Sequence, residues 1–278
     1  MFFYIRTSIQ TLFLLENKLY RKIRKRMSYL DKYYSYYNPK DGKYYVDKSY
    51  PQKRKIRRNY LNQDPPYYYA RICVYKTPDS NVSAERVYQD VYVTTDKIWK
   101  RDCNLSFVVK NSLSNIEVVD SRFNNIRNEF VENRGFSGLS QRAQDLLRHN
   151  CYERSISVFY VGGETLPGGA KGIAYPIPNS SAPGGFNLAI VIADGASTLI
   201  LSHELGHSLM TRDIPGYGIF AVDPSKAPNS PNRGHTDEEN NIMNPVLQQG
   251  KEYYVNSAQC EKVKQSPYVL IPPGIPAN

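Results

Sequence analysis

The sequence predicts an α+β fold with α/β-like character, built around a twisted mixed sheet of about five strands. Segments of strand composition alternate along the chain with segments of helical periodicity, which favours a sheet covered by helices over a barrel of hairpins. The segment GIAYPIP, residues 172–178, contains two prolines and can pair only at an edge of the sheet. The segment TLILSHELGHSLM, residues 198–210, is apolar around nearly its whole circumference, as a helix running through the interior would be. These observations predict an antiparallel edge strand and a buried helix.

The body of the protein, residues 69–270, holds the predicted elements in a regular order. The strand ARICVYKT, residues 70–77, is β-branched and aromatic, and the helix over residues 83–102 has apolar residues at spacings of three and four. The segment FNLAIVIAD, residues 186–194, is continuously apolar, as expected of a strand covered on both faces. The other predicted elements are, in chain order, strands at 104–111 and 115–120, helical material over 122–149, and a buried strand at 156–163.

The N-terminal extension, residues 1–68, differs from the body in charge and composition. Residues 1–60 contain 16 of the 36 lysines and arginines but only 4 of the 26 acidic residues, so the remainder carries a net charge of −2. Tyrosines alternate with the basic residues and aliphatic residues are few, so we interpret the extension as a poorly ordered tail or a pro-segment. Residues 271–278 are a short tail. The alternative is that residues 1–60 bind nucleic acid or an anionic surface, because basic residues interleaved with aromatics can contact phosphates and stack on bases.

The sequence indicates neither a clear signal peptide nor a transmembrane span. Arg6, Gln10 and Glu16 interrupt the first apolar run, and the basic cluster follows that run instead of preceding it. Met27 is an available alternative start. No stretch approaches the ~20 apolar residues that a membrane span needs. Oligomeric state is not indicated.

The cysteines are widely spaced and leave the redox state open. No C-x-x-C pair occurs, which argues against a metal site built from thiolates. One or two disulfides in an oxidising compartment and four buried thiols both fit the spacing, and all three complete pairings remain open. The four residues are Cys73, Cys103, Cys151 and Cys260.

The helix at 198–210 carries the residue pattern that a zinc hydrolase requires. His203 and His207 are four residues apart, so their imidazoles lie about 40° apart around a helix axis and can reach one point. Two neutral imidazoles can bind Zn²⁺, and the adjacent carboxylate of Glu204 can take a proton from a water on the metal. Buried ionisable groups are unfavourable without a partner, and a metal ion provides one. An isolated H-E-x-x-H also occurs by chance in ordinary helices.

The pattern resembles the extended motif H-E-x-x-H-x-x-G-x-x-H of the metzincin metalloproteases, which is followed by a turn with a methionine beneath the metal. The first five positions match at residues 203–207, but Met210 stands in the glycine position and Asp213 in the position of the third histidine. Further along, GHTDEENNIMNP, residues 234–245, is similar to the stretch that carries the third histidine into the methionine turn in many bacterial members.

This resemblance, over roughly residues 70–268, implies a zincin-like fold with a central zinc-binding helix, a Met-turn and a C-terminal helix. It implies that His235 is the third ligand, that Met243 is the turn residue, and that residues 211–233 are an insertion between the second and third ligands. The role of Met243 would be packing beneath the site. The resemblance also favours an extracellular location.

The residues themselves offer three candidates for the third ligand. Asp213, six residues after His207, would lie about 9 Å further along a continuing helix and point away, and Met210 disfavours the sharp reversal that a glycine permits. His235 is free of this objection, because a long loop can return from any direction at an entropy that grows only logarithmically with length. We therefore prefer His235 to Asp213. Glu238 or Glu239 ranks last, because DEENN has the composition of a turn.

Together the pattern and the resemblance predict a zinc-dependent endopeptidase that acts on a protein or peptide substrate. In this hypothesis Zn²⁺ is bound by His203, His207 and His235, and Glu204 is the general base. The edge segment around Gly172 to Ile177 resembles the strand against which such proteases bind an extended peptide. The alternative is a catalytically inactive scaffold of the same fold that acts as a binding protein through its basic aromatic N-terminal arm. The missing motif glycine favours that alternative.

Overall fold

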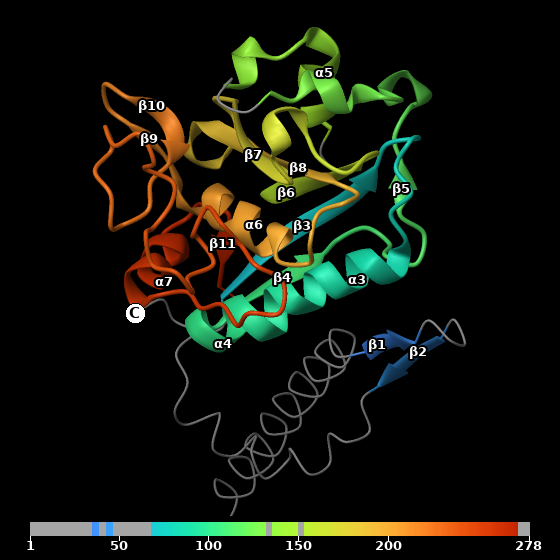
Figure 1. Ribbon diagram of the computed structural model, residues 1–278, viewed down its shortest axis with the longest axis horizontal. Coiled ribbons are helices and arrows are strands. Elements are labelled where there is room, and N and C mark those ends of the chain that lie inside the picture. The colour runs from blue at the N-terminus through green and yellow to red at the C-terminus, as the bar shows by residue number, and fades with distance from the viewer. Residues whose placement is uncertain (1–34, 39–42, 47–67, 132–134, 150–152, 272–278) are drawn as a thin grey trace, which may run out of the picture. The chain divides into compact units, whose positions relative to one another are not determined.

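The fold was analysed in a computed structural model, which describes residues 35–38, 43–46, 68–131, 135–149 and 153–271 (Figure 1). The chain divides into two compact units, Met1–Asp64 and Pro65–Asn278, and each is described by itself. In the first unit, β1 (Ser35–Asn38) and β2 (Lys43–Val46) form an antiparallel pair. The rest of the predicted N-terminal extension, and with it the nucleic-acid or anionic-surface hypothesis, lies outside the described residues.

The second unit is built on a mixed, mainly parallel sheet, as the sequence predicts. The strand order is β11-β3-β6-β8-β7, and β4 and β5 also pair with β3. β3, β4, β5, β6 and β8 run parallel to one another, whereas β7 at one edge and the short β11 are antiparallel to their neighbours. The strands are β3 (Tyr68–Lys76), β4 (Leu105–Val109), β5 (Glu117–Val118), β6 (Ser155–Val161), β7 (Gly172–Pro178), β8 (Phe186–Ala193) and β11 (Val269–Leu270).

The sheet separates two apolar layers, because successive side chains of a strand point to opposite faces. On one face, Val158 of β6 and Ile190 of β8 pack with the helices α3 (Ala84–Tyr92) and α6 (Ile200–Met210). On the other face, Phe159 and Val191 pack with the helix α5 (Gln141–Leu147). Figure 1 shows α6 and α3 on the side of the sheet away from α5. The candidate site therefore belongs to the α6 layer.

The predicted helix over 83–102 forms as one continuous helical segment with a wide turn in its middle. It begins after Ser83, whose side chain accepts a hydrogen bond from the N–H of Arg86. α3 passes into a π-helical turn at Val93–Trp99 and then into α4 (Lys100–Cys103). The side chain of Trp99 donates a hydrogen bond to the carbonyl of Ser202 at 3.2 Å, which connects this helical segment to α6.

The prediction of helical material over 122–149 is only partly correct. The described part of that stretch contains three short 3₁₀ turns, Ser121–Phe123, Ile126–Glu129 and Phe136–Gly138, joined by irregular chain. Among these described residues, α-helix forms only in α5. Asn125 adopts the left-handed conformation with φ of 56°, which separates the first two turns. The turns place Phe123, Ile126 and Phe130 in the same apolar layer as α5.

The C-terminal part of the unit contains a hairpin and a helix, and a disulfide links that helix to α4. β9 (Thr211–Ile214) and β10 (Gly218–Ala221) form an antiparallel hairpin directly after α6. The predicted C-terminal helix is α7 (Ser257–Lys264). Of the pairings that the sequence left open, the structure forms Cys103–Cys260, which joins α4 to α7 across 157 residues. No described cysteine is a free thiol, and Cys151 lies outside the described residues.

A search of the described helices for membrane spans finds none with the length and apolar character that a bilayer crossing requires.

Candidate metal centre

Helix α6 carries two of the predicted ligands through the interior. Nearly every residue of the helix is buried, and Leu201, Leu205 and Leu209 belong to the apolar layer between the sheet and α3. His203 and Glu204 are 6% and 5% exposed, so both polar side chains are almost wholly withdrawn from water. Such groups are stable in an interior only with partners, which makes their surroundings informative.

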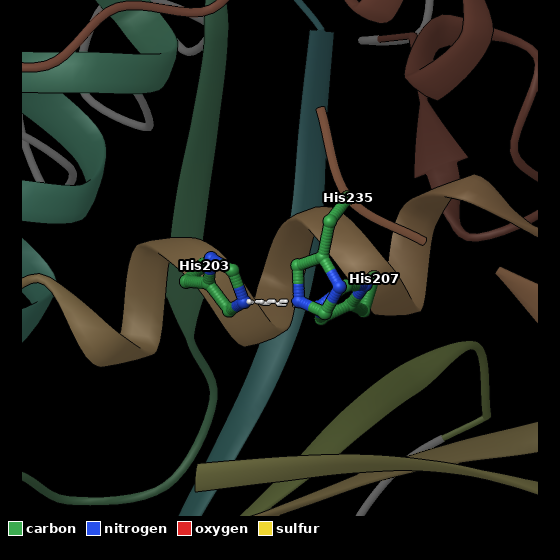
Figure 2. A group of neighbouring side chains, drawn as sticks. All are labelled: His203, His207 and His235. Atoms are coloured by element: carbon green, nitrogen blue, oxygen red, sulfur yellow. Dashed lines mark hydrogen bonds between the residues drawn. The ribbon is translucent and has the colours of Figure 1, made fainter. Parts of the chain in front are cut away.

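Three imidazoles converge at one point beside α6 (Figure 2). The Nε2 atoms of His203 and His207 are 3.0 Å apart. The Nε2 atom of His235 lies 3.2 Å from that of His207 and 3.3 Å from that of His203. In a tetrahedral zinc site with Zn–N distances of about 2.0–2.1 Å, neighbouring ligand nitrogens are separated by about 3.3 Å. The triangle of nitrogens therefore has the size of one face of such a tetrahedron.

The tautomer of His203 suits metal binding. Its Nδ1 atom lies 2.7 Å from the carbonyl oxygen of Ile242. Because a carbonyl can only accept, Nδ1 must carry the proton, and Nε2 then presents a lone pair to the other two imidazoles. Metal-binding histidines commonly fix their orientation through a carbonyl or carboxylate in this way. The contribution of Ile242 is made by its main chain, so the side-chain pattern gave no sign of it.

Burial favours the neutral form of the two helical imidazoles. The pKa of His203 is lowered to about 4, chiefly by burial and in part by the nearby His235, against a raising effect of the Ile242 hydrogen bond. Burial also lowers the pKa of His207 well below its usual value, and the two neighbouring histidines add to that effect. Neutral imidazoles with converging lone pairs are the protonation state that a divalent cation needs. The size of the triangle fits a zinc ion, and so do the tautomer of His203 and the lowered pKa values of His203 and His207.

Met243 packs directly against α6 at the level of the histidines. It is completely buried. A Cβ atom placed on Gly206 would lie 2.2 Å from the Met243 sulfur and 3.2 Å from the Trp99 ring. Only glycine at this position therefore allows the methionine to approach the helix between His203 and His207. In this arrangement Met243 packs against the helix.

The other candidates for the third ligand lie outside this group. Helix α6 ends at Met210 and the chain enters β9 at once, so the continuing helix considered for Asp213 does not form. Asp213 is exposed on β9 opposite Ile219. Glu238 accepts hydrogen bonds from Asn241, Tyr254 and Asn256, and Glu239 pairs with Lys251. Of the predicted ligands, the structure brings together His203, His207 and His235.

The edge strand β7 passes close to Glu204. A Cβ atom on Gly172 would lie 2.8 Å from Cγ of Glu204, so the backbone of β7 borders the carboxylate. Hydrogen bonds from Ala193 to Lys171 and from Asn179 to Gly185 show that odd-numbered residues of this stretch bond to β8. The even-numbered residues of β7 consequently direct their N–H and C=O groups to the outer edge.

That outer edge has an uneven set of donors. Gly172 and Ala174 offer both an N–H and a C=O group, whereas Pro176 and Pro178 offer only C=O. The placement of the prolines on the unpaired side explains how they are tolerated in the strand, as the sequence predicts.

The chain is similar to a solved metalloproteinase structure at low sequence identity. That structure is the crystal structure of metalloproteinase-II from Bacteroides fragilis, with 15% identity and a TM-score of 0.44. The comparison covers 86% of this chain and 69% of that chain. No protein-family model and no curated protein sequence matches the chain.

The depressed pKa values predict that the metal-free protein loses stability on mild acidification. As the pH falls from about 6.5 towards 4, histidines of the unfolded chain take up protons that buried His203 cannot, so the free energy of unfolding falls through that window. With a folded pKa of about 4, His203 alone accounts for a loss of about 2 kcal/mol at pH 5 relative to pH 7. The measurement is urea unfolding in chelator at both pH values. The His203→Asn variant should lose this part of the pH dependence, and an equal pH dependence in both proteins would contradict the assignment.

The close approach of Met243 predicts that Gly206→Ala destabilises the protein. Alanine has the better helix propensity by about 1 kcal/mol, but its methyl group overlaps the Met243 sulfur, and overpacking of this kind costs about 1–3 kcal/mol. We expect a net loss of about 1 kcal/mol in chemical unfolding. Gly135→Ala is the matched control, because no atom lies within 4 Å of its added methyl group. A Gly206→Ala protein more stable than wild type would show that Met243 is free to move aside.

Proposed function

We propose that this protein is a zinc-dependent endopeptidase whose metal ion is held by His203, His207 and His235. The observation that supports this most strongly is the triangle of Nε2 atoms with sides of 3.0, 3.2 and 3.3 Å. Two of these atoms come from one helix, and the third comes from a segment 28 residues further along the chain. Zinc bound there would polarise the scissile carbonyl and make a water molecule a stronger acid.

In this mechanism Glu204 moves the proton. Its carboxylate lies on α6 between the two helical histidines in sequence, and its position against Gly172 places it at the edge where a substrate would lie. Glu204 takes a proton from the attacking water as the water oxygen bonds to the carbonyl carbon. It then gives that proton to the amide nitrogen as the C–N bond breaks. His203 is kept oriented during these steps by its bond to Ile242.

We propose further that an extended peptide substrate pairs with the outer edge of β7. Addition of a strand to an exposed edge satisfies the main-chain groups of both partners and needs no particular side chain. Gly172 and Ala174 supply N–H donors for this pairing. Beyond them, the main chain of Pro176 and Pro178 has no N–H group and can only accept hydrogen bonds. The outward N–H donors of β7 are therefore confined to the part of the strand nearest Glu204.

The disulfide supports an oxidising location for this activity. Cys103 and Cys260 are joined in the folded protein, and such bonds persist mainly outside the cytosol. We therefore include an extracellular site of action in the proposal.

The central test combines zinc content with hydrolysis of casein or a quenched peptide. Glu204→Ala should keep stoichiometric zinc but lose activity by a factor of about 10²–10⁴, the usual contribution of a general base. His235→Ala should lose both zinc and activity. Asp213→Ala is the matched control and should keep both, because Asp213 is exposed and lies outside the histidine group. Wild-type protein that neither binds zinc nor cuts peptides would refute the proposal.

The substrate arrangement predicts an effect of proline in β7. Ala174→Pro removes one outward N–H donor without removing a bond to β8, so the fold should persist and kcat/KM should fall about fivefold, the effect of one lost hydrogen bond of about 1 kcal/mol. Pro176→Ala, which adds a donor on the same edge, is the opposite change and should leave kcat/KM equal or higher. Equal kcat/KM values for Ala174→Pro and wild type would exclude main-chain pairing at this residue.

A further inference from the structure

A buried hydrogen-bond network connects three separate segments next to the histidine site. It consists of the side chains of Asp223, Asn241 and Gln259, and all three residues are completely buried. Asp223 follows the β9–β10 hairpin, Asn241 begins the turn that contains Met243, and Gln259 lies on α7. Gln259 Nε2 donates to Asp223 Oδ2 at 2.6 Å, and Asn241 Nδ2 donates to Gln259 Oε1 at 2.9 Å.

The carboxylate of Asp223 determines the direction of these bonds. A carboxylate only accepts, so the amide nitrogen of Gln259 must face Asp223 and the amide oxygen must face Asn241. The nitrogen of Asn241 then faces Gln259, and its oxygen is left to accept from the N–H of Met243 at 2.9 Å. The Gln259 oxygen also accepts from the N–H of Asn256 at 3.0 Å. The carboxylate of Glu238, which accepts from Asn241 Nδ2 at 2.8 Å, and these two main-chain N–H groups favour the same amide directions as Asp223.

At one end, the network holds the carbonyl that orients His203. The bond from the Met243 N–H to the Asn241 side chain closes the turn around Ile242. The N–H of Ile242 donates to the carbonyl of Tyr254 at 2.9 Å, and its own carbonyl accepts from Nδ1 of His203. The position of that carbonyl therefore depends on the direction of the Asn241 amide.

At the other end, the network fixes where the chain returns with His235. The N–H of Asp223 donates to the carbonyl of Arg233 at 2.7 Å, which closes the loop between them. The Asp223 carboxylate also accepts from the N–H and the hydroxyl of Ser225 at 2.9 and 2.6 Å. His235 follows two residues after Arg233, and Gly234 between them lies against the ring of His207. Gln259 anchors this loop base to α7, which the disulfide at the adjacent Cys260 joins to α4.

We propose that Asp223, Gln259 and Asn241 are positioning residues that hold His203 and His235 in their metal-binding arrangement. The inference rests on the proposed metal centre and extends it to residues that touch neither metal nor substrate. It accounts for how a chain without the glycine of the extended motif brings a third imidazole back to α6. The long segment between His207 and His235 is closed at its base by the main-chain N–H of Asp223. The carboxylate of the same residue connects this base to Gln259 and, through the Asn241 amide, to the turn that orients His203.

The test uses the full chain and a charge-relocating double variant. Asp223→Asn keeps the shape of the side chain but has one acceptor oxygen in place of two, so it cannot accept from both Ser225 and Gln259. Gln259→Glu alone places two carboxylates in contact. In the double variant Asp223→Asn/Gln259→Glu, the new amide nitrogen can donate to the new carboxylate, and the donors from Ser225, Asn241 and Asn256 all keep an acceptor.

The readouts are the Zn²⁺ dissociation constant, from competition with a chromophoric chelator, and the visible spectrum of the Co²⁺-substituted protein. We expect Asp223→Asn and Gln259→Glu each to weaken Zn²⁺ binding roughly tenfold or more and to alter the Co²⁺ spectrum, as loss of partners that orient ligands does. The double variant should return to within about threefold of wild type, less than the tenfold change expected on loss of an orienting partner. Tyr160→Phe is the control for stability alone, because it removes a buried hydrogen bond to Asp90 that involves no residue of the network and no histidine of the site, and it should leave both readouts unchanged.

Folded single variants that bind Zn²⁺ as tightly as wild type, with an unchanged Co²⁺ spectrum, would overturn the inference and leave the metal centre standing. A double variant that remains as weak as the single variants would also overturn it. If Asp223→Asn does not fold, Gln259→Met breaks the same bond with a side chain of similar length, and the same loss is expected. Wild-type protein that binds no Zn²⁺ would instead overturn the proposed function, and this inference with it.

Discussion

The burial of polar groups on α6 is the constraint on which the rest of this unit depends. Burial of the apolar residues around most of the circumference of α6 stabilises the fold. The same burial also removes the polar side chains of His203 and Glu204 from water. An unpartnered polar group in an interior is strongly unfavourable. The surrounding segments are arranged to supply partners, with the Ile242 carbonyl at one nitrogen of His203 and two further imidazoles at the other. The helix can therefore be buried only because these partners are present, and the imidazoles among them complete the histidine group.

Close packing around the same helix depends on two positions without side chains. Gly206 allows Met243 to lie against α6, and Gly172 allows the backbone of β7 to lie against Glu204. Protein interiors transmit small displacements because they are densely packed. A methyl group at either position would displace a neighbour that contributes to the site, so the geometry of the imidazoles is set as much by these contacts as by the histidines. Steric fit and hydrogen bonding act here on the same few atoms.

Much of the fold was predictable, because its signals are local. The prolines at 176 and 178 placed the edge strand, and continuous apolar runs gave the central strands. His203, His207 and His235 lie together in the structure. The sequence indicated this through the four-residue spacing of the first two on a helix and the long loop that can bring the third back. What the sequence could not supply depends on long-range partners. The disulfide pairing and the Asp223–Gln259–Asn241 network both join segments far apart along the chain.

The pairing of β3 with β11 has a consequence for how the protein is made. Ala70 pairs with Val269, so the first strand of this unit bonds to its last, across roughly 200 residues. The parallel partners of β3 also come from later segments, since β6 starts at Ser155. Folds dominated by such distant contacts form slowly, because chain entropy is lost before the contacts that compensate for it are made. The pairing of β3 on this side is completed only when Val269 and Leu270 are available, and until then its apolar residues are open to aggregation.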